Sequence, residues 1–288
     1  MSVFSDARRA FHAQLLNSIL HVGKSGVPSN ADKDSRASIA IAQAIVSQIG
    51  DAARKSRKAA QTSGAQFEDA CADFLRTTFS ELGHLRPGIW RVGTPAHLFK
   101  TGTQKTIAGF DQFAHLADLE TLAAANTGLA AAIGSDYLIK PDIVVAREPE
   151  SDARINEARE LVDSGIAVRT PLRAANSRLP ILHASISCKW TLRSDRAQNA
   201  RSEGLNLVKN RKGRVPHIAV ITAEPTPARI ASIALGTGEI DCVYHFALPE
   251  LQAELAKLDL PDAQLMLQTM VEGRRLRDIA DLPLDLAV

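Results

Sequence analysis

The sequence has few cysteines, no long apolar run and no flexible linker. The three cysteines, Cys71, Cys188 and Cys242, are odd in number and scattered, which excludes a disulfide framework and a thiolate metal site. No stretch approaches the roughly 18 uncharged apolar residues that a membrane span needs. The first residues lack a basic stretch followed by an apolar one, so we expect no secretory signal. These absences favour a protein of the reducing cytoplasm that has no membrane partner.

The composition is that of an ordinary folded protein. Hydrophobic residues make up 45% of the chain and charged residues 23%, which argues against intrinsic disorder. A chain of 288 residues is long enough for one large domain or two small ones. Because there is no internal repeat, low-complexity segment or Gly/Ser/Pro-rich linker to divide it, we expect a single domain over residues 1–288.

The net charge of +2 hides an uneven distribution. Residues 189–214 contain eight basic and two acidic residues, so this stretch carries +6 and the rest of the chain sums to −4. A local basic concentration on an otherwise balanced protein indicates a site for a polyanion such as nucleic acid. A solvated, charge-rich helix would have the same composition, so charge alone leaves both interpretations open.

Hydrophobic periodicity predicts alternating helices and strands. Apolar residues at helical spacing predict helices over residues 4–20, 38–49, 67–85, 117–132, 197–210, 227–235, 248–256 and 263–271. Short apolar, β-branched runs predict strands over residues 88–92, 137–145, 181–190, 217–222 and 242–246. This pattern is typical of an α/β fold, in which helices flank a central mixed β-sheet.

Polar residues on two of the predicted strands carry the chemistry. Asp142 follows a proline within an apolar run, where a carboxylate has to be exposed, paired or bound to a cation. On the next strand, two-residue alternation places Ser187 and Lys189 on one face, and Glu203 lies on the helix that follows. Asp142 and Glu203 could hold Mg²⁺ while the Lys189 amine polarises a water beside a phosphate. The alternatives are a turn residue, a solvated lysine and an ordinary ion-pair partner.

These residues resemble the PD-(D/E)xK nuclease superfamily. Pro141-Asp142 corresponds to the first part of that motif, and Ser187-Cys188-Lys189 stands where the acid-x-Lys would be, with the acid relocated to Glu203. The surrounding residues are similar to type II restriction endonucleases whose palindromic targets have a CCGG core. The similarity covers essentially the whole chain, including residues 29–32, 61–64, 183–203, 222–227 and 235–288.

The resemblance implies a restriction-endonuclease-like core that cleaves double-stranded DNA. The catalytic residues it implies are Asp142, Ser187, Lys189, Glu203 and Glu68. Asp142 and Glu203 would hold Mg²⁺, two ions per active site, with help from the backbone carbonyl of Cys188. Lys189 would orient the attacking water, while Ser187 supports the site and Glu68 supplies an additional acid near the metals.

The resemblance also implies an assembly and a biological partner. It implies a homotetramer built as a dimer of dimers, in which each dimer encloses one DNA duplex. A cognate methyltransferase would act on the same DNA site and need not bind the nuclease.

The segment after the catalytic strand suits the recognition of G·C pairs. Residues 193–196 read Arg-Ser-Asp-Arg, and we expect them to form a tight loop. Arg193 and Arg196 can each match guanine O6 and N7, while the Asp195 carboxylate can accept from the cytosine N4 amino group. The alternative is a turn in which arginine and aspartate pair internally.

A second pair of residues is expected to read the outer base pairs. Arg229 and Asp32 lie in segments that match the family, and together they could read one more G·C pair and extend the target to GCCGGC. Gln61 is a further expected DNA contact from the resemblance. The alternative is that Arg229 pairs with Glu224 or contacts a phosphate.

Three functions remain open at this point. The first is a Mg²⁺-dependent restriction endonuclease, and the second is a DNA-binding module that has lost cleavage. The third is a structure-selective nuclease, which would need no base-reading segment. Plasmid cleavage with and without EDTA separates the first two, and the uniqueness of the cut sequence separates the third.

Overall fold

A computed structural model describes residues 2–50, 60–98, 106–133, 139–236 and 238–288. The chain forms two compact units. The first unit comprises Met1–Leu82, Ile186–Gly204 and Ile218–Val288, and the second comprises Gly83–Ser185 and Leu205–His217. The prediction of a single domain stays a prediction.

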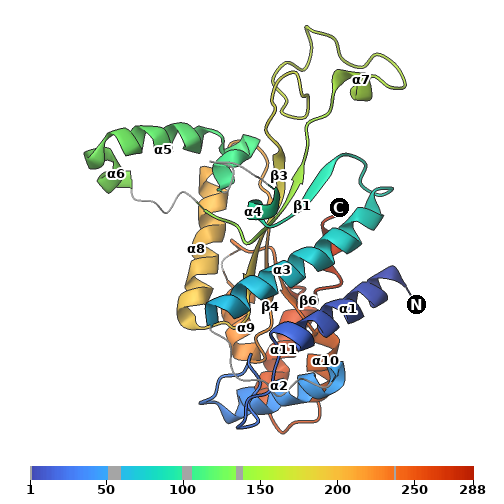
Figure 1. Ribbon diagram of the computed structural model, residues 1–288, viewed down its shortest axis with the longest axis vertical. Coiled ribbons are helices and arrows are strands. Elements are labelled where there is room, and N and C mark those ends of the chain that lie inside the picture. Colours follow the sequence, from blue (N-terminus) through green and yellow to red (C-terminus); the bar gives the residue numbers. More distant parts are fainter. Residues whose placement is uncertain (1, 51–59, 99–105, 134–138, 237) are drawn as a thin grey trace. The chain divides into compact units, whose positions relative to one another are not determined.

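Helices supply most of the regular structure (Figure 1). The α-helices of the described residues are α1 Val3–Ser18, α2 Arg36–Ile49, α3 Ala60–Phe79, α4 Pro95–Leu98, α5 His115–Ala125, α6 Thr127–Ile133, α7 Asp152–Ile155, α8 Ser194–Asn210, α9 Pro227–Ala234, α10 Leu248–Leu255, α11 Pro261–Glu272 and α12 Leu282–Asp285. Short 3-10 turns are η1 Ser80–Leu82, η3 Ile107–Gly109 and η4 Asp111–Phe113. No helix among these is long and apolar enough to cross a membrane.

Six strands form one mixed sheet in the order β1-β2-β3-β4-β5-β6. The strands are β1 Trp90–Gly93, β2 Ile143–Arg147, β3 Ile181–Lys189, β4 His217–Thr222, β5 Cys242–His245 and β6 Leu276–Asp278. β1 pairs antiparallel with β2, whereas β4, β5 and β6 are parallel to one another. The predicted α/β class with a mixed sheet and flanking helices is confirmed.

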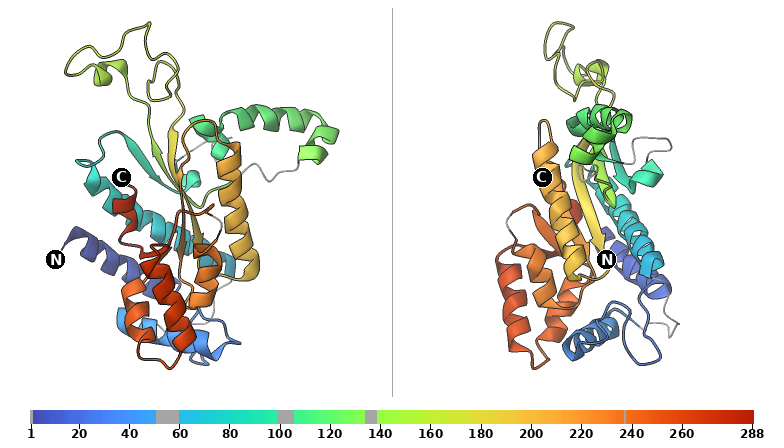
Figure 2. Two further views of the ribbon diagram at one scale, coloured as in Figure 1. Left: turned by 180° about the vertical axis from the view of Figure 1, so that it is seen from behind. Right: turned by 90° about the vertical axis from the view of Figure 1, so that its left-hand side faces the viewer.

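The first unit buries apolar faces of helices against one another and against the sheet. Ser35 caps α2 by accepting from the Ser38 N–H, and the helix buries Ile41 and Ile45 at four-residue spacing. Each such side chain contributes roughly 1.5–3 kcal/mol when it leaves water. α1 packs along α3, and α9 lies beside α11 (Figures 1 and 2). The C-terminal strands β5 and β6 are therefore covered by α9, α10 and α11.

The second unit contains β1, β2, the helices α5 and α6, and the N-terminal part of β3. The Trp90 ring packs edge-on against His183 at 5.1 Å, and the guanidinium groups of Arg86 and Arg147 lie 5.3 and 5.7 Å from it. Arg173 binds Asp152 with two hydrogen bonds of 2.9 and 2.7 Å, which stabilises the long connection between β2 and β3.

Two predicted element boundaries are wrong for local reasons. The helix expected over residues 117–132 is interrupted at Asn126, because the Asn126 side chain accepts from the Leu129 N–H and so starts a new helix, α6. The strand expected over residues 137–145 starts only at Ile143. Pro141 has no N–H for a strand ladder, so Asp142 precedes β2 and does not lie within it. Residues 137 and 138 lie outside the described residues.

Candidate active site and DNA interface

The C-terminal end of β3 alternates as its sequence predicts. Ile186 and Cys188 are buried, while Ser187 and Lys189 are half-buried on the opposite face. The following residue, Trp190, packs its ring edge-on against Phe67 of α3 at 5.2 Å. Its indole N–H also donates to the backbone carbonyl of Ser29 at 3.3 Å. The end of β3 is therefore anchored on both α3 and the segment after α1.

The middle of α8 places Glu203 against β3. The Ser187 hydroxyl donates to one carboxylate oxygen of Glu203 at 2.8 Å. The next residue, Gly204, lies so close to the chain before β5 that an added Cβ would be 2.6 Å from the Glu239 carbonyl oxygen. Arg201, on the same helix, binds Glu239 at 2.5 Å. These contacts fix the helix, and with it the Glu203 carboxylate, within the first unit.

A pocket of about 560 Å³ in the first unit brings together residues from distant parts of the sequence. Its cationic side chains are Lys189, Arg193, Arg196 and Arg229, and its carboxylates are Asp32, Glu68 and Glu203. Cys188 lines the same pocket. A concave surface that combines several cations with carboxylates suits a phosphodiester together with a metal ion.

The expected tight loop at residues 193–196 is instead the start of α8. Ser194 is the first residue of that helix, so Asp195 and Arg196 occupy its first turn. Arg193 and Asp195 are exposed, and the Arg196 guanidinium donates to the Thr191 hydroxyl at 3.1 Å. The prediction of a loop is wrong because the helix begins three residues earlier than its apolar spacing indicates. The three side chains nevertheless keep their place directly after β3.

Arg229 and Asp32 form an ion pair in the pocket. The Arg229 guanidinium donates to the Asp32 carboxylate, and its other terminal nitrogen lies 3.8 Å from Glu224. A hydrogen bond from the Asp34 backbone N–H, reinforced by Arg229, lowers the pKa of Asp32 below its usual value. Two residues that are far apart in sequence, and were expected to read the same base pair, are therefore neighbours. The alternative contact with Glu224 is also present.

The segment after β4 connects these parts of the pocket. The Thr222 hydroxyl donates to the Lys189 carbonyl at 2.8 Å, and the Ala223 N–H donates to the same oxygen at 3.3 Å. The buried Asn30 side chain in turn donates to the Ala223 carbonyl at 2.9 Å. Sequence reasoning assigned no role to these contacts, although the polar residues that follow an apolar strand were a usable signal.

The other predicted site residues are placed as follows. Glu68 lies half-buried on α3 and lines the pocket. Gln61 belongs to α3 by its backbone, but its side chain lies outside the described part of the chain. Asp142 belongs to the second unit, where it stands half-buried between buried Pro141 and β2.

The donor set of the pocket is compatible with a hard divalent cation. Among the described residues, no group of three or more His, Cys, Asp or Glu side chains is assembled for a metal. A site of two carboxylates and a backbone carbonyl needs no such group, because Mg²⁺ keeps several waters. A carboxylate has about four lone-pair sites, so Glu203 can accept from Ser187 and still bind a cation.

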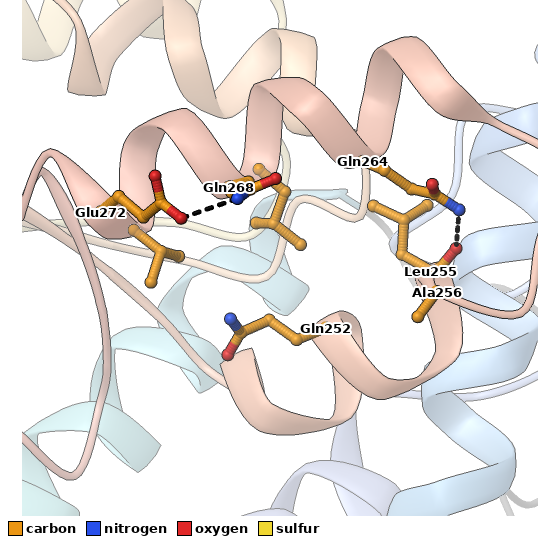
Figure 3. Close-up of a pocket in the computed structure, with 8 residues that line it drawn as sticks. Gln252, Leu255, Ala256, Gln264, Gln268 and Glu272 are labelled. Carbon is orange, nitrogen blue, oxygen red and sulfur yellow. Dashed lines mark hydrogen bonds between the residues drawn. The ribbon is translucent and has the colours of Figure 1, made fainter.

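A second pocket, of about 410 Å³, lies between α10 and α11 (Figure 3). Among the described residues that line it, Glu272 is the charged one, and its carboxylate accepts from Gln268 at 2.7 Å. Its described lining residues therefore include no cationic side chain, in contrast to those of the pocket at the end of β3.

Comparison with known proteins shows the family of this chain. The chain matches the model of the NgoMIV restriction enzyme family over residues 11–288. It is similar to a type II restriction enzyme, NgoMIV, of Neisseria gonorrhoeae, with 54% identity over 287 residues that cover 99% of each chain. On this evidence, the chain belongs to the NgoMIV restriction enzyme family.

Proposed function

We propose that this type II restriction endonuclease cleaves double-stranded DNA at GCCGGC by Mg²⁺-dependent phosphodiester hydrolysis. The proposal is carried by one observation: the pocket at the end of β3 combines Lys189 and Glu203 with the base-reading candidates Arg193, Arg196 and Arg229. The family match over residues 11–288 supports it. A DNA-binding module without cleavage would have no need of the lysine and carboxylates in that pocket.

Restriction endonucleases use a divalent metal, and we infer that here it is Mg²⁺, with two ions per active site. Asp142 and Glu203 would hold it, with the backbone carbonyl of Cys188 as a further oxygen ligand. Glu68 is the additional acid at this pocket. When bound, the metal would supply positive charge at the scissile phosphate.

The protein's own groups would orient the reactants. The Lys189 ammonium has three donors, so it can hold the attacking water and donate to a phosphate oxygen on which negative charge develops. Ser187 holds the Glu203 carboxylate through the 2.8 Å hydrogen bond and so fixes its direction. Hydrolysis breaks the bond from phosphorus to the leaving oxygen and leaves a phosphate and a hydroxyl on the two new ends.

Recognition would use two sets of residues. Arg193 and Arg196 would bind guanines of the CCGG core, and Asp195 would accept from a cytosine amino group. Arg229 and Asp32 would read the outer G·C pair, which gives GCCGGC. We also assign a DNA contact to Gln61, from the family resemblance.

We further propose a homotetramer composed of two dimers. A palindrome has two-fold symmetry, and an isologous dimer matches it because each subunit reads one half-site. A cognate methyltransferase would protect the same sequence without binding the nuclease.

The test is to digest a plasmid of known sequence with Mg²⁺ and to map the fragment ends. We expect cuts at GCCGGC alone, and no cuts in EDTA. Binding without cutting in Mg²⁺ would favour the DNA-binding module. Cuts at DNA junctions or ends without a common sequence would favour the structure-selective nuclease.

A further inference from the structure

Glu224 is a fully buried carboxylate directly after β4, with an exposed fraction of 0%. One of its oxygens accepts from the Leu192 backbone N–H at 2.9 Å, and the other accepts from the Thr226 N–H at 3.1 Å. The first oxygen also lies 3.8 Å from the Arg229 guanidinium. A single buried group thus contacts the chain that enters residues 193–196 and one of the residues expected to read the outer base pair.

The backbone of Glu224 is held as firmly as its side chain. Its N–H donates to the Thr222 hydroxyl at 3.1 Å. Its carbonyl accepts from the ring of His245 at 3.2 Å, and His245 is itself fully buried. Both the backbone and the carboxylate of this buried residue are therefore held by hydrogen bonds within the protein.

Burial of a carboxylate is costly unless donors satisfy it, and burial raises the pKa of Glu224 above its usual value. A fold that needed only packing at this position would be served as well by an apolar side chain. Two neighbours of the Glu224 carboxylate are linked to residues that are expected to read bases. Leu192 immediately precedes Arg193, and Arg229 is paired with Asp32. This selection of partners indicates a role in placing the base-reading residues.

We propose that Glu224 is a positioning residue for sequence discrimination. It fixes the backbone that leads into Arg193 and orients the guanidinium of Arg229, and thereby couples recognition of the inner base pairs to recognition of the outer ones. Glu224 itself contacts no base. The inference rests on the proposed function, because it assumes that these arginines read DNA.

The first test is Glu224→Gln. Glutamine has nearly the same shape but no charge. Its amide oxygen can accept from one of the Leu192 and Thr226 N–H groups, but its amide nitrogen is a donor and cannot accept from the other. Competition binding should use GCCGGC, a duplex altered at the outer pair, and a duplex altered at an inner pair. We expect the preference for GCCGGC over each altered duplex to fall about tenfold, which is the scale of one well-placed base contact. Affinity for DNA without the site should stay unchanged.

The matched control is Glu254→Gln in α10. Glu254 is also mostly buried, with 11% of its side chain exposed, and accepts from Gln48 at 2.6 Å and from Lys257 at 2.5 Å. The substitution Glu254→Gln makes the same chemical change outside the pocket. We expect the control to keep the wild-type preference for both altered duplexes, and an equal loss in the control would overturn the inference.

A double substitution separates positioning from a general loss of stability. In the Arg229→Ala background, Glu224→Gln should cause no further loss at the outer pair but should still weaken discrimination at the inner pair. Equal additional loss at both positions would contradict the role through Arg229. If Glu224→Gln does not fold, Glu224→Asp keeps the charge and both oxygens but withdraws them by one methylene, and it should show a smaller loss of the same kind.

These measurements separate a failure of the proposed function from a failure of the positioning role of Glu224. If the wild-type protein shows no preference for GCCGGC, the proposed function fails. If the wild type prefers GCCGGC and folded Glu224→Gln keeps that full preference, the proposed function stands and the positioning role of Glu224 is wrong.

Discussion

The hydroxyl of Ser187, near the C-terminal end of β3, donates at 2.8 Å to the carboxylate of Glu203 in the middle of α8. The hydrogen bond fixes the direction of the carboxylate oxygens. In the proposed active site, a serine stands where the wider nuclease superfamily has an acid, and it would hold the acid that has moved to α8.

Ser187→Ala should weaken Mg²⁺-dependent cleavage without abolishing it. Loss of a group that orients a metal ligand typically costs 10- to 100-fold in metal affinity or activity. We therefore expect cleavage to fall by roughly that factor at low Mg²⁺ and to recover partly at high Mg²⁺. Cleavage rates over a Mg²⁺ titration measure this. The control is Ser47→Ala, an exposed serine of α2, and a Ser187→Ala titration that matches it would contradict the prediction.

Removal of either predicted metal ligand should separate binding from cleavage. Asp142→Ala and Glu203→Ala each delete an oxygen ligand but no base contact, so cleavage should be lost and binding of GCCGGC retained. Binding without metal should even tighten, because a negative charge near the phosphates is gone. Gel shifts in EDTA and digests in saturating Mg²⁺ provide the two measurements. Glu272→Ala on α11 is the control, and wild-type cutting by either ligand variant would sink the metal assignment.

Arg229→Ala should relax recognition at the outer base pair alone. A base-reading arginine is worth about 1–3 kcal/mol of discrimination at its own position. Competition between GCCGGC and ACCGGT duplexes measures that loss. If Arg229 instead contacts a phosphate, the variant should bind all sequences more weakly and show a shallower salt dependence. Arg76→Ala, an exposed arginine of α3 paired with Asp73, serves as the control for lost charge.

The proposed tetramer predicts that the cleavage rate depends on the number of recognition sites in the plasmid. If two dimers act together in a tetramer, a plasmid with two GCCGGC sites should be cut faster than a plasmid with one. A short duplex that carries the site should accelerate cutting of the one-site plasmid when added in trans. Equal rates for both plasmids, with a dimer in light scattering, would argue against the tetramer.

His245 should make the fold sensitive to acid. Its Nδ1 accepts from the Ala247 N–H while its Nε2 faces the Glu224 carbonyl, and complete burial lowers its pKa to about 4. A histidine whose pKa is lowered in the folded state stabilises the fold fully at pH values above its unfolded-state pKa of about 6.5. That contribution to stability is lost as the pH falls toward 4. Wild type should therefore lose about 2 kcal/mol more of its unfolding free energy between pH 7 and pH 5 than His245→Asn does.

Urea unfolding of both proteins at the two pH values gives the comparison. The raised pKa of Glu224 acts with the opposite sign, since its contribution is lost as pH rises, but it is present in both proteins. Parallel pH dependence in the two proteins would show that His245 does not titrate in this window.

The sequence predicted those parts of the fold that depend on local periodicity. The alternation at Ser187 and Lys189 and the apolar run of β4 are short-range patterns, and both are confirmed. β6 was not predicted, because three residues are too few to show a period. The break at Asn126 was missed because a side-chain cap can override favourable helix composition.

The candidate site also has features that the sequence predicted and features that it did not. Family resemblance named Asp32 and Arg229, yet their pairing joins residues 197 positions apart and no local pattern encodes it. The contact of Glu224 with Leu192 likewise joins residues 32 positions apart, and it arises only when β4 is placed beside the end of β3. Residue types can suggest chemistry from sequence, but the partners that orient them are set by tertiary packing.

Gly204 has a consequence for how this enzyme can be altered by mutation. A methyl group there would press on the Glu239 backbone, which cannot swing aside as a flexible side chain could, so α8 itself would have to shift. The residue before it is Glu203, and the helix begins with the segment expected to read DNA. A random-mutagenesis screen for altered target choice would therefore recover Gly204 substitutions among the inactive clones. They would resemble lesions of the chemistry itself, although the glycine has no side chain with which to touch a metal or a base.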